Sequence, residues 1–173
     1  MRIIDNFLHK KDFKEIQEWI LEPSCRWSYS PCVVDPNDEV DEDPAAYQFV
    51  NMIYYSRMGH ENPDCARIFT LLDKLRPQVL LKAKLNMQMM TDTIRVNDKH
   101  TDFTPSITCT TAIYYINSNN GYSLIGDKKV ESVENRIVLF NGKTLHTGTT
   151  CTDERRRLVL NLNFQGGPYD QTN

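Results

Sequence analysis

Alternation of apolar and polar residues is strongest near the C-terminus, where it predicts a strand. Between residues 157 and 164, one set of alternate positions is apolar and the other set is mixed. The apolar set is Leu158, Leu160, Leu162 and Phe164, and the mixed set is Arg157, Val159, Asn161 and Asn163. Because successive side chains of a strand point to opposite faces, the apolar face should pack outward on helices and the mixed face should look into a cavity.

Residues 84–89 alternate in the same way. The polar positions are Lys84, Asn86 and Gln88, and the apolar positions are Leu85, Met87 and Met89. This pattern predicts a strand with one core face. We interpret the methionines at 87, 89 and 90 as core residues, although the adaptable thioether could also line a cofactor pocket.

Other strands are predicted from β-branched and aromatic residues between turn signals. The expected segments are residues 1–8 as a short lead-in, 47–57, 106–117 and 136–140. A hairpin over residues 122–134 should turn at Gly126-Asp127, and Asn141-Gly142 is a tight-turn signal.

Two helices precede most of these strands. Asp12 is expected to cap a helix that runs to about Leu21, with Pro23 just beyond its end and an apolar stripe of Phe13, Ile16, Trp19 and Ile20. A second helix should begin at Asn62-Pro63-Asp64 and bury Ile68, Leu71, Leu72 and Leu75, with Pro77 interrupting it. Helices followed by many short strands predict an α+β fold, and the strand spacing suits a jelly roll, or double-stranded β-helix. The helices should pack on the outer face of its larger sheet.

Composition then narrows the class of protein. The 173 residues are expected to form a single domain, 1–173, with 40% hydrophobic and 25% charged residues, as in ordinary globular proteins. The formal net charge of −3 argues mildly against a nucleic-acid partner. We expect no membrane segment and no signal peptide. The five cysteines are odd in number and form no CxxC pair, which disfavours disulfides and a zinc site and fits a reducing cytoplasm.

Candidate chemistry lies in His100-Thr101-Asp102 and in His146, which follows 44 residues after Asp102. Two residues apart on a strand, His100 and Asp102 would face one cavity, and His146 would join them from another strand. Two histidines and one carboxylate form the ligand set of non-haem Fe(II) sites with open coordination positions. A His-x-Asp triplet or a single histidine is individually weak; the combination predicts a metal site.

An arginine cluster, 155–157, opens the alternating strand near the C-terminus. A guanidinium can bind a carboxylate through two parallel hydrogen bonds, so an arginine near the metal would suit a dicarboxylate. We favour Arg157 because the alternation starts immediately after it, and Arg155 and Arg156 remain rivals.

These motifs resemble the 2-oxoglutarate/Fe(II) dioxygenase superfamily, in particular its prolyl 4-hydroxylase-like branch with small phage and bacterial members. The matching segments are HTD at 100–102, TTAIYYIN at 110–117, NRIVLFNGKTLHTG at 135–148 and RRLVLNLNF at 156–164. The resemblance implies the same jelly roll, Fe(II) on His100, Asp102 and His146, and 2-oxoglutarate on Arg157 and Tyr115. No catalytic residue beyond the metal ligands is implied.

The resemblance also implies an activity. The expected enzyme hydroxylates a C–H bond, most readily that of a prolyl residue in a peptide or protein, and releases succinate and CO₂, with ascorbate supporting full activity. Alternatives are hydroxylation of free proline or another small metabolite, repair of alkylated nucleic-acid bases, and a jelly-roll module that binds metal without turnover. Hypoxia-sensing prolyl hydroxylases carry a tyrosine shortly before their H-x-D motif, where this chain has Met89-Met90-Thr91.

The acidic, proline-containing stretch 30–46 has two interpretations. It is a solvated surface loop, as charge runs usually are, or it is a lid of the kind known in prolyl hydroxylase-like enzymes. As a lid, its negative charge would favour a basic substrate.

Overall fold

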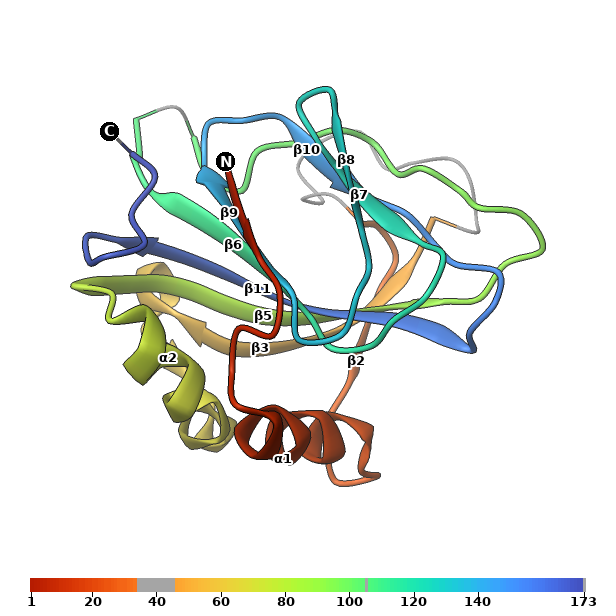
Figure 1. The fold of residues 1–173 in the computed structure, drawn as a ribbon, viewed down its shortest axis with the longest axis horizontal. Coiled ribbons are helices and arrows are strands. Elements are labelled where there is room, and N and C mark those ends of the chain that lie inside the picture. The colour runs from red at the N-terminus through yellow and green to blue at the C-terminus, as the bar shows by residue number, and fades with distance from the viewer. Residues whose placement is uncertain (34–45, 105, 173) are drawn as a thin grey trace.

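The computed structural model describes residues 1–33, 46–104 and 106–172 (Figure 1). Most of the predicted lid, residues 34–45, lies outside the described residues. The elements are β1 (Arg2–Ile4), α1 (Lys10–Leu21), β2 (Ser28–Ser30), β3 (Gln48–Tyr55), η1 (Ser56–Met58), β4 (His60–Glu61), η2 (Pro63–Ile68), α2 (Phe69–Leu75), β5 (Val79–Met89), β6 (Thr110–Tyr115), β7 (Tyr122–Ile125), β8 (Lys128–Glu131), β9 (Ile137–Asn141), β10 (His146–Gly148) and β11 (Arg156–Gln165).

Two antiparallel sheets form the core of the fold. The larger has eight strands in the order β1-β9-β6-β11-β5-β3-β2, with β4 paired to β3, and the smaller has the order β10-β7-β8. In Figure 1 the smaller sheet lies on one side of the larger sheet, and both helices lie on the other side. This arrangement confirms the predicted α+β class with a jelly-roll core and helices on the outer face of the larger sheet.

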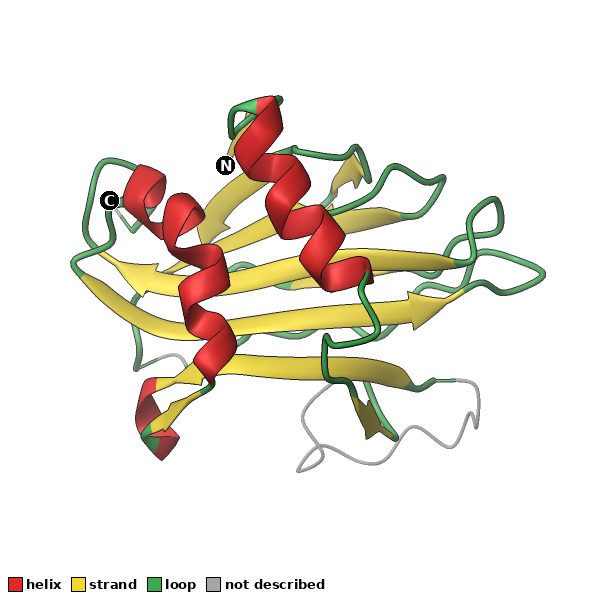
Figure 2. Ribbon diagram, turned by 90° about the horizontal axis from the view of Figure 1, so that it is seen from below, coloured by secondary structure: helices red, strands yellow, loops and turns green. Residues whose placement is uncertain are grey.

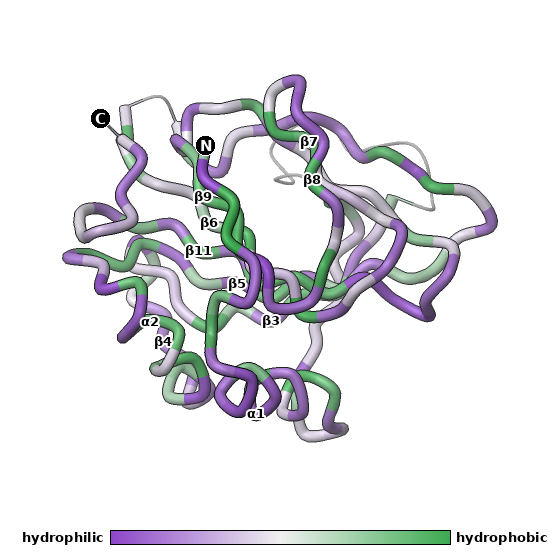
Figure 3. Tube along the Cα trace, viewed as in Figure 1, coloured by the Kyte–Doolittle hydropathy of each residue, from purple (hydrophilic) through white to green (hydrophobic). Residues whose placement is uncertain are grey.

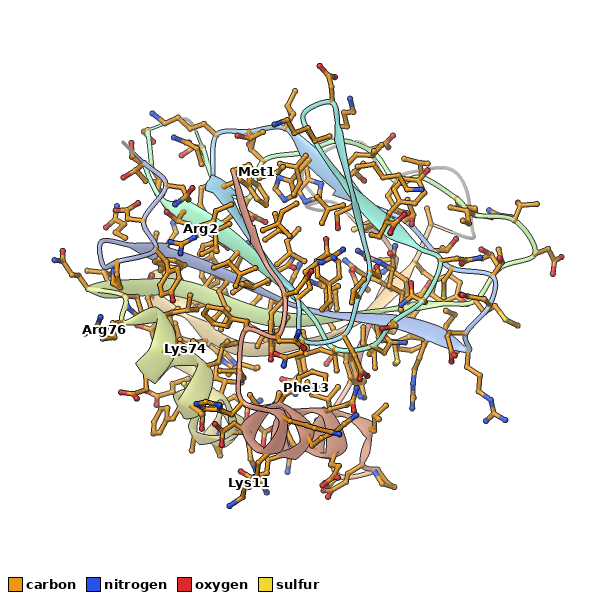
Figure 4. The ribbon with its side chains drawn as sticks, viewed as in Figure 1. Met1, Arg2, Lys11, Phe13, Lys74 and Arg76 are labelled. Atoms are coloured by element: carbon orange, nitrogen blue, oxygen red, sulfur yellow. The ribbon has the colours of Figure 1, made fainter. Side chains whose placement is uncertain are left out.

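Helix α1 packs on the larger sheet through its predicted apolar stripe. Phe13, Ile16, Trp19 and Ile20 are all buried, and Figure 2 shows both helices lying across one face of the sheet. Phe13 points toward the sheet and Lys11 points away (Figure 4), and the side of α1 that faces away is largely hydrophilic (Figure 3). None of the helices in the described ranges is long and apolar enough to cross a membrane.

The predicted cap of α1 is wrong. The helix begins at Lys10, its N-cap is His9 without a side-chain hydrogen bond, and Asp12 lies within the first turn. A carboxylate in the first turn interacts favourably with the positive end of the helix dipole, so aspartate is common both at the cap and one turn inside it. The sequence pattern does not separate these two positions.

The second predicted helix forms in two parts. Its first part, η2, is a 3₁₀ helix, and Asn62 caps its start. The side-chain oxygen of Asn62 accepts a hydrogen bond from the backbone N–H of Asp64 at 3.0 Å. It continues into α2, which ends at Leu75, two residues before Pro77. Ile68, Leu71 and Leu75 are buried as predicted.

Strand β11 divides the interior into two regions. Its apolar residues pack in the core between the larger sheet and the helices; they are Leu158, Leu160, Leu162 and Phe164. Its other face contributes Val159 to a second apolar cluster between the two sheets, together with Ile113 and Tyr115 of β6. Both faces therefore behave as the alternation predicts.

The methionine prediction holds only for Met87, which is buried in the helix-side core. Met89 is 37% exposed and Met90 is 53% exposed. The reason is positional, since β5 ends at Met89 and the chain then enters a loop. The predicted 122–134 hairpin is confirmed by the pairing of β7 with β8, with Gly126 at positive φ in the turn.

Asn135 ties the N-terminal segment to the sheet. Its side-chain oxygen accepts hydrogen bonds from the backbone N–H of Leu8 at 2.9 Å and from the hydroxyl of Tyr114 at 2.7 Å. Its side-chain nitrogen donates to the carbonyl of Leu8 at 2.9 Å. These bonds are buried, so they fix the lead into α1 against β6 and thereby the helix layer against the jelly roll.

Candidate metal centre

His100, Asp102 and His146 meet at one end of the space between the sheets. Each offers one ligand atom, and these three atoms lie within 4.8 Å of one another. His146 is 2% exposed, and the side chain of Asp102 is 6% exposed. The structure thus brings together all three residues that the sequence singled out as metal ligands.

The local structure that achieves this differs from the prediction. His100 lies in an isolated β-bridge with His146, in which each backbone N–H donates to the other residue's carbonyl at 2.9 and 3.0 Å. Asp102 follows in a bend, not on a strand. Together with the bridge between Val96 and Thr149, this segment replaces a regular fourth strand of the smaller sheet. The predicted same-face strand geometry for His100 and Asp102 is therefore wrong, although the two side chains still converge.

Both histidines have Nδ1 at a backbone carbonyl, which leaves Nε2 as the atom that could bind a metal. Nδ1 of His146 lies 3.1 Å from the carbonyl of Thr144, and Nδ1 of His100 lies 3.3 Å from the carbonyl of Asp98. A carbonyl can only accept, so Nδ1 of each ring donates to it, and in the neutral tautomer this leaves the lone pair on Nε2 for a metal. Burial, with help from the neighbouring His146, lowers the pKa of His100 and favours its neutral form.

The Nε2 atom of His146 tests whether a metal fits. It is buried and has no hydrogen-bond partner among the described residues, and it lies 3.7 Å from Oδ2 of Asp102. A buried imidazole nitrogen without a partner carries a desolvation penalty. A divalent cation between the two imidazoles and the carboxylate would remove that penalty, and this donor set suits Fe(II).

Asp102 is held by three residues from the larger sheet. Lys82 Nζ lies 3.3 Å from Oδ1, and Oδ2 accepts hydrogen bonds from Asn163 at 2.8 Å and Thr111 at 3.2 Å. Burial alone would raise the pKa of Asp102, but Lys82, His146 and the Asn163 bond outweigh it and hold that pKa far below its usual range. The carboxylate is therefore ionised and fixed in rotation.

Lys82 was missed by the sequence analysis. The alternation noted at residues 84–89 extends two residues further back in β5, which places Lys82 on the same inward face as Lys84 and Asn86. Lys82 is 9% exposed. A lysine at one end of an alternating strand is usually solvated, so the sequence offered the periodicity but no sign of burial.

Arg157 and Tyr115 lie together at another part of the cavity wall. Arg157 donates from Nε to the hydroxyl oxygen of Ser132 at 2.8 Å and from Nη2 to that of Ser123 at 2.9 Å. The Tyr115 hydroxyl donates to the same Ser123 oxygen at 2.9 Å, and the guanidinium carbon lies 5.7 Å from the Tyr115 ring centroid. Neither serine was singled out from the sequence.

The burial of Arg157 separates it from its two neighbours. Arg157 is 4% exposed, whereas Arg155 is exposed and Arg156 is partly buried. Within residues 1–33, 46–104 and 106–172, no carboxylate lies within ion-pair distance of Arg157. Burial lowers the pKa of Arg157, yet an arginine remains charged in proteins. A buried cation without an acidic partner is the expected state of a site that binds an anion.

One cavity contains both the His-Asp-His group and Arg157. Its wall is mostly polar, with Lys84, Ser123, Thr147 and the carboxamides Gln48, Asn86, Gln88, Asn97 and Asn161, while Val33, Ile113 and Val159 supply apolar surface. Gln88 pairs across the strands with Arg157 and is buried, whereas Met89 and Met90 are exposed. Gln88 therefore supplies the wall beside Arg157, and Met89 and Met90 do not line the cavity.

Comparison with known proteins supports the fold. No protein-family model matches the chain, and no curated protein sequence matches it. Among solved structures, a Trichoplax adhaerens prolyl hydroxylase in complex with a hypoxia inducible factor peptide fragment is 16% identical, with a TM-score of 0.63 over 95% of this chain and 83% of that one. A Pseudomonas putida prolyl-4-hydroxylase is 14% identical, with a TM-score of 0.58, and the match covers 96% of this chain and 92% of that one. The epimerase SnoN, in complex with Fe³⁺, α-ketoglutarate and nogalamycin RO, is 11% identical, with a TM-score of 0.63. The match covers 94% of this chain and 77% of that one.

Proposed function

We propose that this protein is an Fe(II)- and 2-oxoglutarate-dependent oxygenase that hydroxylates a C–H bond and releases succinate and CO₂. The observation that carries the proposal is the shared cavity, which holds a His-Asp-His ligand set and a buried arginine with no acidic partner among the described residues. A metal-binding module would need only the first feature. The second is needed only if an anion binds beside the metal.

His100, Asp102 and His146 would hold the metal on one side and leave its other positions open. Bound there, Fe(II) would supply the activation of O₂ that couples decarboxylation of 2-oxoglutarate to hydroxylation. The chain's own part is orientation: Lys82 and Asn163 fix the carboxylate of Asp102, and backbone carbonyls fix both imidazoles. Such outer hydrogen bonds typically matter about 10- to 100-fold for metal affinity or activity.

Arg157 would bind the far carboxylate of 2-oxoglutarate, and the Tyr115 hydroxyl would turn its one proton from Ser123 to that carboxylate. Two serines hold the guanidinium from behind, so its position is set before the ligand arrives. Burial raises the pKa of the Tyr115 phenol and keeps it protonated as a donor. Ile113 and Val159 give the same cavity the apolar surface that the methylene groups of the co-substrate need.

The substrate that we favour is a prolyl residue of a peptide or protein. Two of the similar folds are those of prolyl hydroxylases, and one of these was solved with a peptide fragment. A small-molecule substrate, free proline included, is the second candidate, and the similar structure of the epimerase SnoN, solved in complex with nogalamycin RO, supports it. We place the protein in a reducing cytoplasm, because its five cysteines are free and buried and Fe(II) is itself readily oxidised.

The test is succinate formation from 2-oxoglutarate with Fe(II) and ascorbate, alone and with free proline or proline-containing peptides. Wild-type protein should turn over 2-oxoglutarate, and the active substrate should stimulate this and gain the mass of one oxygen. Asp102→Ala and His146→Ala should each remove Fe(II)-dependent turnover, because each deletes one of three ligands. Circular dichroism should show both variants folded.

Wild-type succinate yield from either variant would remove that residue from the proposed centre. Folded, iron-loaded wild-type protein that forms no succinate under any condition would favour the binding-module alternative. Both results are independent of which substrate is correct.

A further inference from the structure

Two asparagines on neighbouring strands face the candidate metal centre. Asn86 lies on β5 and Asn161 on β11, and both line the cavity that contains His100 and His146. In the strand pairing, Asn86 is opposite Val159 and Asn161 is opposite Lys84, so the two asparagines are diagonal neighbours on one face. Side chains in this relation are close enough to bind one ligand group together.

Neither carboxamide is fully used by the fold. The Oδ1 atoms of Asn86 and Asn161 are buried and have no hydrogen-bond partner among the described residues. Asn86 is only 7% exposed. Each unpaired buried polar atom costs about 1–3 kcal/mol. Asn135, which is 6% exposed and lies outside the cavity, has partners on both its oxygen and its nitrogen.

The pair lies beside the proposed carboxylate site and differs from it in direction. Asn86 is a diagonal neighbour of Arg157 as well as of Asn161, and Asn161 lies one strand away from Tyr115. The guanidinium of Arg157 is directed toward Ser123 and Ser132, outside the larger sheet. Asn86 instead lies on the side of the cavity formed by β3, where the Gln48 side chain donates to the carbonyls of residues 32 and 33.

The chemistry of the pair identifies a class of ligand group. A carboxamide offers one acceptor and one donor side, and so does a peptide group. A carboxylate can only accept and would leave the Oδ1 atoms unpaired, whereas an ammonium can only donate and would leave the Nδ2 atoms unpaired. A peptide group, with its carbonyl oxygen and its N–H, can pair with both atoms of a carboxamide side chain.

We propose that Asn86 and Asn161 form a substrate subsite that binds a peptide group, so that the substrate is peptidyl and not a free amino acid. This proposal rests on the proposed oxygenase function. It assigns to the two asparagines recognition of the substrate amide next to the reacting centre, separate from the co-substrate contacts of Arg157 and Tyr115.

The test uses binding, without turnover. Protein loaded anaerobically with Fe(II) and 2-oxoglutarate is titrated with a panel of N-acetyl amino acid N-methylamides, the prolyl derivative included, and with the matching N-acetyl acids and free amino acids. Perturbation of the iron–2-oxoglutarate charge-transfer absorbance reports binding. At least one N-methylamide should bind tenfold or more tightly than its acid and its free amino acid.

Asn86→Leu and Asn161→Leu should each weaken binding of that N-methylamide at least tenfold and leave the affinity for 2-oxoglutarate within twofold of wild type. Leucine nearly matches asparagine in shape but cannot form the hydrogen bonds. Gln78→Leu, an exposed carboxamide outside the cavity lining, is the matched control and should change neither affinity. Asn161 is the less buried of the two, so Asn161→Leu provides the test if Asn86→Leu does not fold.

Three results would overturn the subsite: N-methylamides that bind no better than the acids, leucine variants that bind them as wild type does, or leucine variants that lose 2-oxoglutarate affinity. The last would assign the asparagines to the co-substrate. If wild-type protein forms no charge-transfer band at all, the oxygenase function itself fails and the subsite falls with it. A normal band without amide binding removes only the subsite.

Discussion

Replacing Arg157 by methionine should separate ligand binding from stability. The side chain is 4% exposed and hydrogen-bonds to two serine hydroxyls. Its charge has no acidic partner in the described part of the chain. Methionine keeps the length and the apolar stem but removes the charge, so Arg157→Met tests what that charge does.

The two expected effects have opposite signs. A carboxylate bound by a guanidinium gains two charge-assisted hydrogen bonds of about 1.5–3 kcal/mol each, so 2-oxoglutarate should bind at least roughly 100-fold more weakly. Folding loses two hydrogen bonds of about 1 kcal/mol each but no longer buries an uncompensated charge, which costs several kcal/mol. The ligand-free variant should therefore be as stable as wild type or more stable by up to about 2 kcal/mol, which is up to about 8 °C in Tm for a chain of this size.

Calorimetric titration of 2-oxoglutarate into Mn(II)-loaded protein measures the first effect, and thermal unfolding of ligand-free protein measures the second. The matched control is Arg156→Met. Arg156 is only partly buried and does not line the cavity, so its loss should leave 2-oxoglutarate binding unchanged.

Two results would refute the reasoning. If Arg156→Met loses 2-oxoglutarate affinity while Arg157→Met keeps it, the strand register is wrong by one residue. If Arg157→Met unfolds at a clearly lower temperature and binds 2-oxoglutarate normally, the arginine is part of the fold and not of the ligand site.

Three further predictions address the surroundings of the site and the fold. Gly148→Ala should weaken 2-oxoglutarate binding several-fold in the same titration without a large change in Tm, because the new Cβ would lie 3.1 Å from Nη1 of Arg157 and displace it. Asn135→Ala should lower the free energy of unfolding by about 3 kcal/mol or more in urea titrations, because it leaves three buried backbone and hydroxyl groups unpaired. Asp5→Asn should cost below about 1 kcal/mol, since the Asp5 side chain is 54% exposed and its ion pair with Arg136 is screened by water. The hydrogen bond from Arg136 lowers the pKa of Asp5, so this stabilisation is present above the unfolded pKa and is lost as the pH falls through the folded pKa. The difference in Tm between wild type and variant should therefore disappear once the pH is below the folded pKa.

Periodicity was sufficient for much of the fold. The alternation in β5 and β11 set which side chains face the helices and which face the cavity, and both assignments agree with the structure. The stripe of α1 worked for the same reason, since burial of one face leaves a direct trace in the sequence. Capping leaves a weaker trace, and Asp12 shows how a residue one turn inside the helix can mimic a cap.

The three residues of the candidate metal centre were identified from the sequence, although their local conformation was predicted wrongly. The triplet 100–102 was assigned to a strand, but it lies in a bridge followed by a bend. The chemistry of the residue types was informative where the local conformation was not. Lys82 and Ser132, by contrast, act through long-range contacts, and their residue types suggested only solvated or turn positions.

The distribution of unpaired atoms is the feature that no sequence pattern could reveal. In the described residues, four buried side-chain atoms have no hydrogen-bond partner, and they belong to Asn86, His146, Asn161 and Asn163. Three of these residues line the cavity, and Asn163 holds Asp102 through its other atom. A fold that pairs its polar groups elsewhere and leaves them unpaired around one cavity gives up stability there, as binding sites commonly do. The metal, 2-oxoglutarate and an amide-bearing substrate would each supply some of the missing partners. We therefore expect the Tm to rise with each ligand added in that order, by an amount set by the affinity of that ligand.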